Sequence, residues 1–393
     1  MGKILEYIQK QGNGKFQCYK TKKISLDLSD NDTLDYDDKA RIQTTSSKIA
    51  ETDRSRVGTV PLKNLIKKDN ISPPLFHFFL DGSRHTYKVD DIGIGKKIFP
   101  IVAGQIIVGC CEREDRDTFK KFDLCSKIVM AMPDDFDDDS GGVNFCRSYC
   151  ENLNNEIAKN KFVKERNVKI DKILLYQTDG NVTENGKDNY KNSAVAKIQN
   201  EMVDEEQLLV AELCKQNRLD DEHWLIKDGS LEYNPSYSNL DSTQWNNLRT
   251  NYQHVVGVSK QFDPELLKDF EGNSLAKTIA NLKPFERTKV YYYPQKHSAG
   301  VSHFGVWYLR LRNTDFRETN FSDIVKCEML LLKEDQQLES EIVNLLSTNL
   351  IREAYPVCYG SDTRWANHLY PIYLTETFIK SHYIDNNVIL LVA

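Results

Sequence analysis

The segments FHFFLDGS (76–83) and HWLIKDGSL (223–231) share the tripeptide Asp-Gly-Ser, and an apolar run precedes it in each. We predict two short buried strands that end on Asp81 and Asp228, each followed by a sharp turn that the glycine permits. A carboxylate at the end of a buried strand costs free energy unless something offsets its charge. Carboxylates from neighbouring strand ends suit Mg²⁺ or Mn²⁺, which prefer oxygen ligands. The alternative is that Asp-Gly, a common turn dipeptide, only closes each strand.

The composition is that of an ordinary globular protein, with 40% hydrophobic and 28% charged residues in a chain of 393. The 52 basic and 58 acidic residues give a net charge of −6, which excludes a uniformly basic nucleic-acid coat but not a local basic groove. No apolar run reaches membrane-spanning length, and the first residues lack the apolar core of a signal peptide. The nine cysteines include no C-x-x-C pair. We therefore expect a cytoplasmic protein with reduced thiols, no zinc site and no membrane contact.

The chain divides into a polar N-terminal helical extension (1–70) and a core (71–393) that contains an acidic insertion (113–165). The insertion includes MPDDFDDDSGG (132–142), a like-charge block of the kind found in solvated loops. β-branched and aromatic runs predict strands, and spacings of three and four predict helices. The expected strands are 75–81, 98–112, 168–180, 222–231, 254–260, 288–295, 304–312, 324–332 and 387–393, and the expected helices are 1–11, 60–68, 145–160, 190–217, 242–253, one within 335–357 and one within 364–383.

Further candidate site residues lie on the predicted helices and after a later strand. In the helix 190–217 the carboxylate of Glu206 interrupts an apolar stripe, so it is either the partner of a buried basic residue or a metal ligand. Glu205 is its nearest rival, because helix register alone does not separate them. Lys260 ends the predicted strand HVVGVSK (254–260), and Glu376 lies on a C-terminal helix.

The first part of the core reads strand, strand, strand, helix, strand, which is the order of an RNase H-like α/β fold. A fold of this type brings carboxylates together at the edge of a mixed sheet flanked by helices. Such a site holds two divalent ions that activate water and stabilise the attacking and leaving oxygens of a phosphodiester displacement. No nucleophile elbow, Walker A loop or dinucleotide-binding fingerprint is present.

From residue 75 onward the chain resembles the NurA family of nucleases. The resemblance rests on five motifs in the family's order, namely FFLDGS (78–83), a helix followed by LIKDGSL (about 198–231), VVGVSK (255–260), WYLRLR (307–312) and LYPIYLTE (369–376). It implies a manganese-dependent nuclease that processes DNA ends and forms a toroidal homodimer with a central channel for DNA. It also implies a partner, the hexameric HerA-type ATPase that translocates DNA.

The resemblance assigns roles to individual residues. It implies that Asp81, Glu206 and Asp228 ligate the two metal ions and that Lys260 contacts the scissile phosphate. Glu376 stands where family members often carry His or Asp after the YP motif. Arg310 and Arg312 share one strand face and are candidates for lining a DNA path.

We therefore expect a metal-dependent deoxyribonuclease that acts with a HerA-like motor, in DNA end resection or in defence against foreign DNA. The sequence does not separate these two contexts. A second hypothesis is a NurA-like DNA-binding or scaffold subunit with weak catalysis that docks and regulates the ATPase. It is motivated by Glu376 and by the acidic insertion. A third is an RNA-directed nuclease of the same fold, which a preference for the 2′-hydroxyl would reveal.

Overall fold

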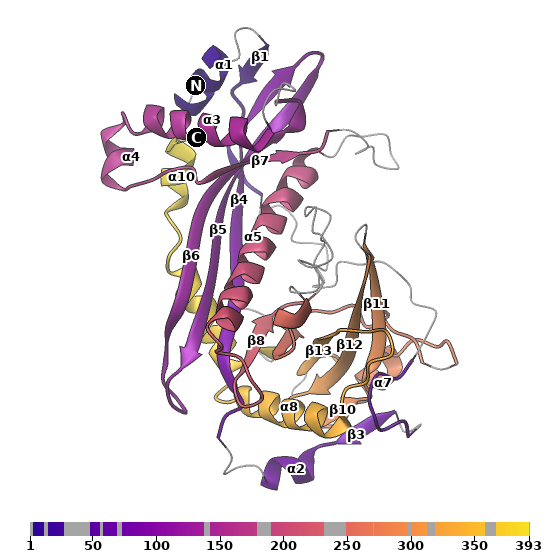
Figure 1. Ribbon diagram of the computed structural model, residues 1–393. Coiled ribbons are helices and arrows are strands. Elements are labelled where there is room, and N and C mark those ends of the chain that lie inside the picture. Colours follow the sequence, from indigo (N-terminus) through magenta and orange to yellow (C-terminus); the bar gives the residue numbers. More distant parts are fainter. Residues whose placement is uncertain are drawn as a thin grey trace.

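One mixed sheet organises the molecule in this computed structural model (Figure 1). The structure describes residues 3–11, 15–26, 48–55, 58–68, 73–136, 142–178, 190–231, 249–269, 271–297, 300–312, 319–357 and 367–392. Within these residues the sheet has 13 strands. They are β1 (Phe16–Tyr19), β2 (Ile24–Ser25), β3 (Thr59–Pro61), β4 (Phe76–Ile94), β5 (Lys97–Arg113), β6 (Phe119–Pro133), β7 (Lys172–Tyr176), β8 (Trp224–Asp228), β9 (Val255–Ser259), β10 (Glu286–Thr288), β11 (Tyr291–His297), β12 (Gly300–Arg310) and β13 (Ile324–Leu331).

The centre of the sheet has the strand order β6-β5-β4-β8-β9. Strands β4, β5 and β6 are antiparallel neighbours, whereas β8 is parallel to both β4 and β9. This is the order expected of an RNase H-like sheet, so the predicted fold class of a mixed sheet flanked by helices is confirmed. Beyond β9 the sheet continues through β13, β12 and β10 to β3, and β11 also pairs with β12 in the predicted antiparallel arrangement.

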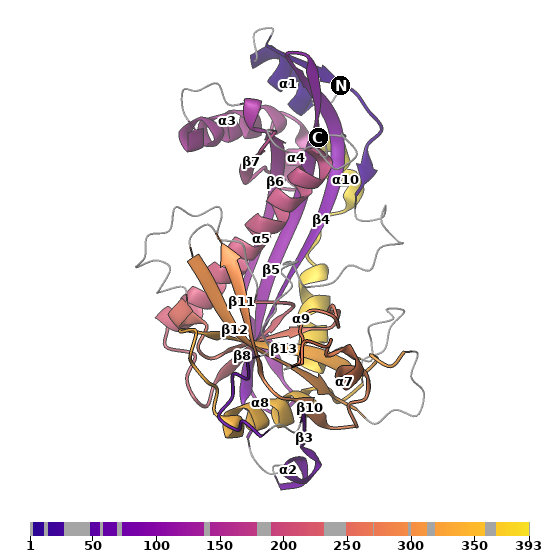
Figure 2. The same ribbon diagram turned by 90° about the vertical axis from the view of Figure 1, so that its right-hand side faces the viewer.

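The helices that the structure describes cover both faces of this sheet. They are α1 (Lys3–Gln11), α2 (Lys63–Lys68), α3 (Gly142–Ile157), α4 (Lys161–Glu165), α5 (Tyr190–Lys215), α7 (Ala276–Ala280), α8 (Ser340–Glu353), α9 (Tyr370–Lys380) and α10 (Asn386–Val392), with a 3₁₀ turn η1 at Asp134–Phe136. Figure 1 shows α5 along the long strands β4–β6, and Figure 2 shows α9 near them. Residues 242–248, part of one predicted helix, lie outside the described residues.

Two glycines of β5 show that α5 and α9 lie on opposite faces of the sheet. A Cβ atom at Gly104 would lie 2.7 Å from Ile198 of α5, and a Cβ at Gly109 would lie 2.5 Å from Ile379 of α9. Residues an odd number apart on a regular strand point to opposite faces. Both helices therefore approach the backbone closely where a side chain is missing, and the sheet separates them.

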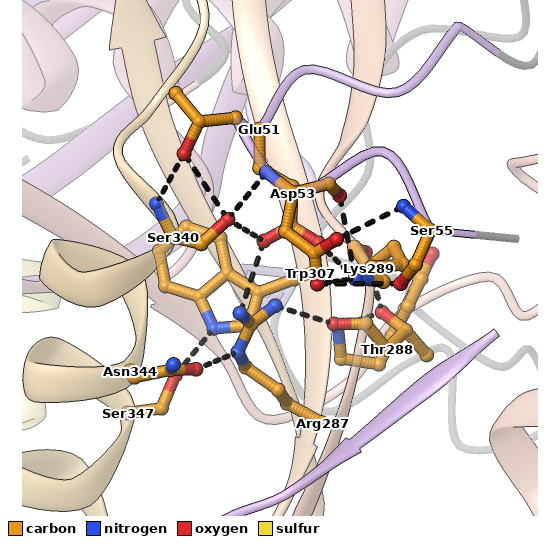
Figure 3. Close-up of polar contacts among 12 residues, drawn as sticks. Glu51, Asp53, Ser55, Arg287, Thr288, Lys289, Trp307, Ser340, Asn344 and Ser347 are labelled. Carbon is orange, nitrogen blue, oxygen red and sulfur yellow. Dashed lines mark hydrogen bonds and ion pairs between the residues drawn. The ribbon is translucent and has the colours of Figure 1, made fainter. Parts of the chain in front are cut away.

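The N-terminal segment is integrated into the sheet rather than forming only the predicted helical extension. Strands β1 and β2 pair with β4, and β3 pairs with β10. A buried ionic network joins the segment to the far end of the sheet (Figure 3). Glu51, which is fully buried, lies 3.0 Å from Arg287 and 3.5 Å from Lys289, and its carboxylate accepts a hydrogen bond from Ser340 of α8. The boundary at residue 70 stays a prediction.

Three predicted elements differ from the structure. Strand β4 does not end at Asp81 but continues to Ile94, so its Asp-Gly-Ser is extended. The acidic stretch contains β6, which the sequence did not predict because its first half is partly exposed and includes the charged residues Lys120, Lys121 and Asp123. The C-terminal run 387–393, predicted as a strand, contains helix α10. Asp385 precedes α10 and accepts a hydrogen bond from the amide of Asn387, as helix-capping residues do.

Candidate functional site

Three carboxylates from three elements meet beside the central strands. Asp81 of β4, Asp228 of β8 and Glu376 of α9 each offer an oxygen, and these oxygens lie within 4.8 Å of one another. The parallel pairing of β4 with β8 places Leu80 opposite Lys227, so the aspartates that follow are neighbours. Helix α9 then adds Glu376 from the sheet face opposite α5. The structure thus brings together three of the residues predicted from the sequence.

Asp81 is the least compensated member of this trio. Its side chain is 6% exposed, and it makes no hydrogen bond or ion pair with the described residues. Burial raises the pKa of Asp81 well above its usual value, the charges of Asp228 and Glu376 raise it further, and Lys260 opposes the shift. A buried carboxylate without a partner is costly, and a ligand that supplies positive charge would offset this cost.

Lys260 provides one positive charge inside the trio. Its Nζ lies 2.8 Å from Asp228 Oδ2 and 3.4 Å from Glu376 Oε2, and the residue is 7% exposed. Burial lowers the pKa of the Lys260 ammonium, but Asp228 and Glu376 outweigh burial, so the net shift is upward. Lys260 is therefore a fixed cation at neutral pH.

Glu376 is held by two lysines at once. Its second oxygen, Oε1, accepts a hydrogen bond of 2.6 Å from Lys380, one turn further along α9. Burial raises the pKa of Glu376, but Lys260 and Lys380 together lower it to about 2. Glu376 is consequently ionised throughout the neutral range and contributes a full negative charge to the site.

His368 belongs to the same cluster and was not predicted from the sequence. Its Nδ1 lies 3.5 Å from Lys260 Nζ and 3.8 Å from Glu376 Oε2, and the residue is buried. Arg312 fixes its backbone by donating to the His368 carbonyl at 3.1 Å. A lone histidine before an apolar helix carries no distinguishing sequence signal, since only the return of α9 to the sheet places it here.

Glu206 lies on the other side of the sheet from the three carboxylates. Gly82 faces α5, because a Cβ there would lie 2.5 Å from Glu206 Oε1, and the adjacent Asp81 therefore points to the opposite face. Glu206 is buried and forms an ion pair of 3.0 Å with Lys227. Of the two sequence-based alternatives, a partner for a buried base and a metal ligand, the structure shows the first. The role of Glu206 as a metal ligand stays a prediction.

Glu205 and the two arginines are also engaged in the fold. Glu205 forms an ion pair with Lys127 of β6. Arg310 and Arg312 are buried, and each donates to backbone carbonyls, including those of Ser322 and Ala354 respectively. The expectation that these arginines line a DNA path is therefore wrong for this structure, because their guanidinium groups are used to hold loops.

The residues present fit a divalent cation. Three carboxylates supply the hard oxygen ligands that Mg²⁺ and Mn²⁺ prefer. Asp81 in particular is buried, has no ion-pair partner in the described part of the chain, and lies close to the other two. The donor set contains no cysteine, which argues against a structural zinc site at this position.

No family model matches this chain, and no curated protein matches it. Among solved structures, it is similar to the NurA nuclease from Sulfolobus solfataricus, with a TM-score of 0.38 and 10% sequence identity over 81% of this chain and 86% of that chain. Because a TM-score below 0.5 does not establish a common fold, this similarity carries no functional weight. In the described part of the chain, no helix has the length and apolar character needed to cross a bilayer.

Proposed function

We propose that this chain is a metal-dependent deoxyribonuclease whose site is formed by Asp81, Asp228 and Glu376. The observation that carries the proposal is the buried carboxylate of Asp81, which has no hydrogen-bond or ion-pair partner among the residues that the structure describes and faces two further carboxylates. A divalent cation would stabilise such a cluster, because its positive charge offsets the repulsion between the carboxylates and the cost of burying them. The RNase H-like order of the central strands supports the proposal, because the three carboxylates lie beside these strands.

The bound cation, Mn²⁺ or Mg²⁺, would lower the pKa of a ligated water and neutralise charge on the phosphate. The chain's own residues supply the remaining functions. Asp81, Asp228 and Glu376 would hold the cation, and the Lys260 ammonium, fixed in the charged state, would bind a non-bridging phosphate oxygen. His368, within reach of Lys260 and Glu376, is placed to donate a hydrogen bond to the same phosphate group.

The substrate and partners follow from the resemblance of the five motifs. We propose DNA as the substrate, a homodimer as the assembly, and a HerA-like hexameric ATPase as the partner that feeds DNA to the site. Both resection and defence against foreign DNA are compatible with this activity. Co-purification of the tagged chain with a co-expressed HerA-type ATPase, followed by measurement of the size of the complex, tests the assembly.

The experiment that tests the activity is cleavage of linear single- and double-stranded DNA with Mn²⁺, Mg²⁺ or EDTA. We expect cation-dependent cleavage that falls about 100-fold or more in Asp81→Ala and in Asp228→Ala, the range seen when a main electrostatic contributor is removed. Asp221→Ala is the matched control, since Asp221 precedes the same strand but its side chain is 99% exposed. Undiminished cleavage in both site variants would contradict the assignment.

The scaffold hypothesis has a specific observation in its favour. Lys260 already pairs with two of the three carboxylates, so the cluster is partly neutralised without any metal ion. If the chain is a scaffold, DNA or ATPase binding survives Asp81→Ala, and no cation supports turnover even with the ATPase present. Repeating the cleavage assay with the ATPase decides between the two functions.

A further inference from the structure

The number of metal ions is set by the charges in the site. Two-ion nucleases hold their ions about 4 Å apart, so the surrounding carboxylates and the substrate phosphate must together offset about four positive charges. Here three carboxylates, Asp81, Asp228 and Glu376, lie around one ammonium, that of Lys260, and binding a divalent ion requires the carboxylates that hold it to be ionised. The charges of the three ionised carboxylates and of the Lys260 ammonium add up to two negative charges. One divalent ion balances this charge, and two divalent ions would exceed it.

The ammonium of Lys260 stands where a second cation would bridge two ligands. Its Nζ contacts Asp228 Oδ2 at 2.8 Å and Glu376 Oε2 at 3.4 Å, so one oxygen of each carboxylate is already committed. The other oxygen of Glu376 is committed as well, to Lys380 at 2.6 Å. Asp81, which is 6% exposed, makes no such contact with the residues that the structure describes.

A fourth carboxylate that would support a second ion is turned away. Glu206 lies across the sheet at Gly82 and is neutralised by its ion pair of 3.0 Å with Lys227. Lys227 is itself buried and donates to the Asp228 carbonyl at 2.9 Å, which fixes it on that face. Bringing Glu206 to the cluster would break this pair and leave a buried ammonium unpaired, which is strongly unfavourable.

We infer that this chain takes up one divalent ion, at Asp81, and that the Lys260 ammonium supplies the positive charge a second ion provides in two-ion nucleases. The inference rests on the proposed nuclease site and replaces the two-ion expectation drawn from the resemblance. It assigns Glu206 to an ion pair with Lys227 that supports the fold beneath Asp81, not to the ligand set.

The test is equilibrium binding of Mn²⁺ to the full chain, by calorimetry and by electron paramagnetic resonance of free Mn²⁺. It is run without DNA and with a cleavage-resistant phosphorothioate oligonucleotide. We expect one ion per chain in both conditions, and two ions in either would overturn the inference while leaving the nuclease proposal intact. No binding by wild type, or unchanged binding by Asp81→Asn, would instead refute the proposed site.

Three variants sharpen the result. Glu206→Gln should bind Mn²⁺ within about twofold of wild type, whereas a loss of about tenfold or more would make Glu206 a ligand and overturn the inference. Lys260→Met should bind Mn²⁺ about tenfold or more tightly, because a nearby positive charge no longer repels the ion. Unchanged or weaker binding by Lys260→Met would contradict the role of its charge.

Lys380→Met is the matched control for Lys260→Met. Lys380 also contacts Glu376, but its side chain is 52% exposed, so solvent screens its charge. We expect it to change Mn²⁺ affinity by less than about threefold, and an effect as large as that of Lys260→Met would contradict a special position for Lys260. If Lys260→Met does not fold, as judged by circular dichroism, the wild-type stoichiometry and Glu206→Gln still decide the question.

Discussion

The two Asp-Gly-Ser tripeptides are identical in sequence and different in structure. Asp81-Gly82-Ser83 lies inside β4, which stays extended for eleven further residues, to Ile94. Asp228-Gly229-Ser230 lies at the end of β8, where Gly229 adopts a φ of +81° and the chain turns. Gly82 is needed because a side chain there would collide with α5. Gly229 is needed because its backbone adopts a conformation that other residues rarely adopt. A short motif therefore fixes which chemical groups are present but not the local conformation.

The serines differ in the same way. Ser83 Oγ accepts a hydrogen bond of 2.7 Å from the Tyr383 hydroxyl, in the segment after α9. Ser230 Oγ donates to the buried carboxylate of Glu328 at 2.9 Å, and the amide of Leu231 donates to the same carboxylate at 2.7 Å. The second motif is thus held by a buried anion on β13, which keeps Asp228 at the edge where β8 ends.

The glycine inside the strand gives the largest expected effect on stability. Gly82→Ala would place a Cβ 2.5 Å from Glu206 Oε1 and 3.3 Å from Met202, both in the buried face of α5. We expect the free energy of unfolding to fall by about 2–3 kcal/mol, as for other overpacked cores. Urea denaturation measures it, with Gly58→Ala as the control, where the nearest atom would be 3.9 Å away.

A double-mutant cycle tests the reason for that effect. If the clash with Glu206 is responsible, the effects of Gly82→Ala and Glu206→Ala are non-additive by about 1 kcal/mol or more. Strict additivity would show that Gly82 is needed for another reason, and the contrast between the two glycines would then lose its structural basis.

The next comparison is between the two aspartates, Asp81 and Asp228, whose substitutions should affect stability differently. In metal-free protein at pH 7, Asp81→Asn should raise the free energy of unfolding, because burial and the charges of Asp228 and Glu376 raise the pKa of Asp81 well above its usual value. Asp228→Asn should change it little, because Lys260 at 2.8 Å already offsets the burial of Asp228. Urea denaturation in EDTA compares them, and equal effects would contradict the contrast.

The pH dependence of the Asp81 effect has a defined sign. The folded-state pKa of Asp81 is raised by burial and by Asp228, so its ionisation destabilises the metal-free fold above the unfolded-state pKa. The advantage of Asp81→Asn should therefore vanish as the pH falls toward the ordinary carboxyl pKa of about 4. A gain that persists at pH 3 would show that its cause is packing instead of charge.

The turn glycine should matter less than the strand glycine. Gly229→Ala introduces a side chain at a positive φ but meets no atom closer than 3.9 Å. The expected cost is about 1 kcal/mol, the penalty of the left-handed region for an L-residue. Thermal unfolding of Gly229→Ala beside Gly82→Ala ranks the two glycines, and a larger loss at Gly229 would reverse the interpretation.

The two serines should also differ from each other, and the smallest effect is expected at Ser83. Ser230→Ala removes one of the donors to the fully buried Glu328 and should cost about 1–2 kcal/mol, whereas Ser83→Ala, which loses a half-buried contact, should cost about 0.5 kcal/mol. Paired thermal melts measure the difference. A larger loss at Ser83 would show that the Tyr383 contact, not Glu328, is the more important anchor.

Sequence periodicity predicted most of the core elements because their apolar residues are buried as a strand or helix pattern requires. β5, β9, β13 and α5 are examples. Periodicity failed to predict β6, because the first half of this strand has charged side chains that face solvent. It also failed for the C-terminal run, because a short apolar segment does not distinguish a helix from a strand. The failures lie where tertiary contacts, and not local pattern, decide the conformation.

The sequence by itself determined the acidic chemistry of the site, because Asp81, Asp228 and Glu376 are recognisable as carboxylates attached to buried elements. Only the tertiary structure decided which carboxylates meet. The alternation of β4 sends Asp81 toward α9 and Gly82 toward α5, so Glu206 pairs with Lys227 on one face while Glu376, Lys260 and His368 assemble on the other. That partition depends on which helix covers which face of the sheet, a long-range property that no local spacing encodes.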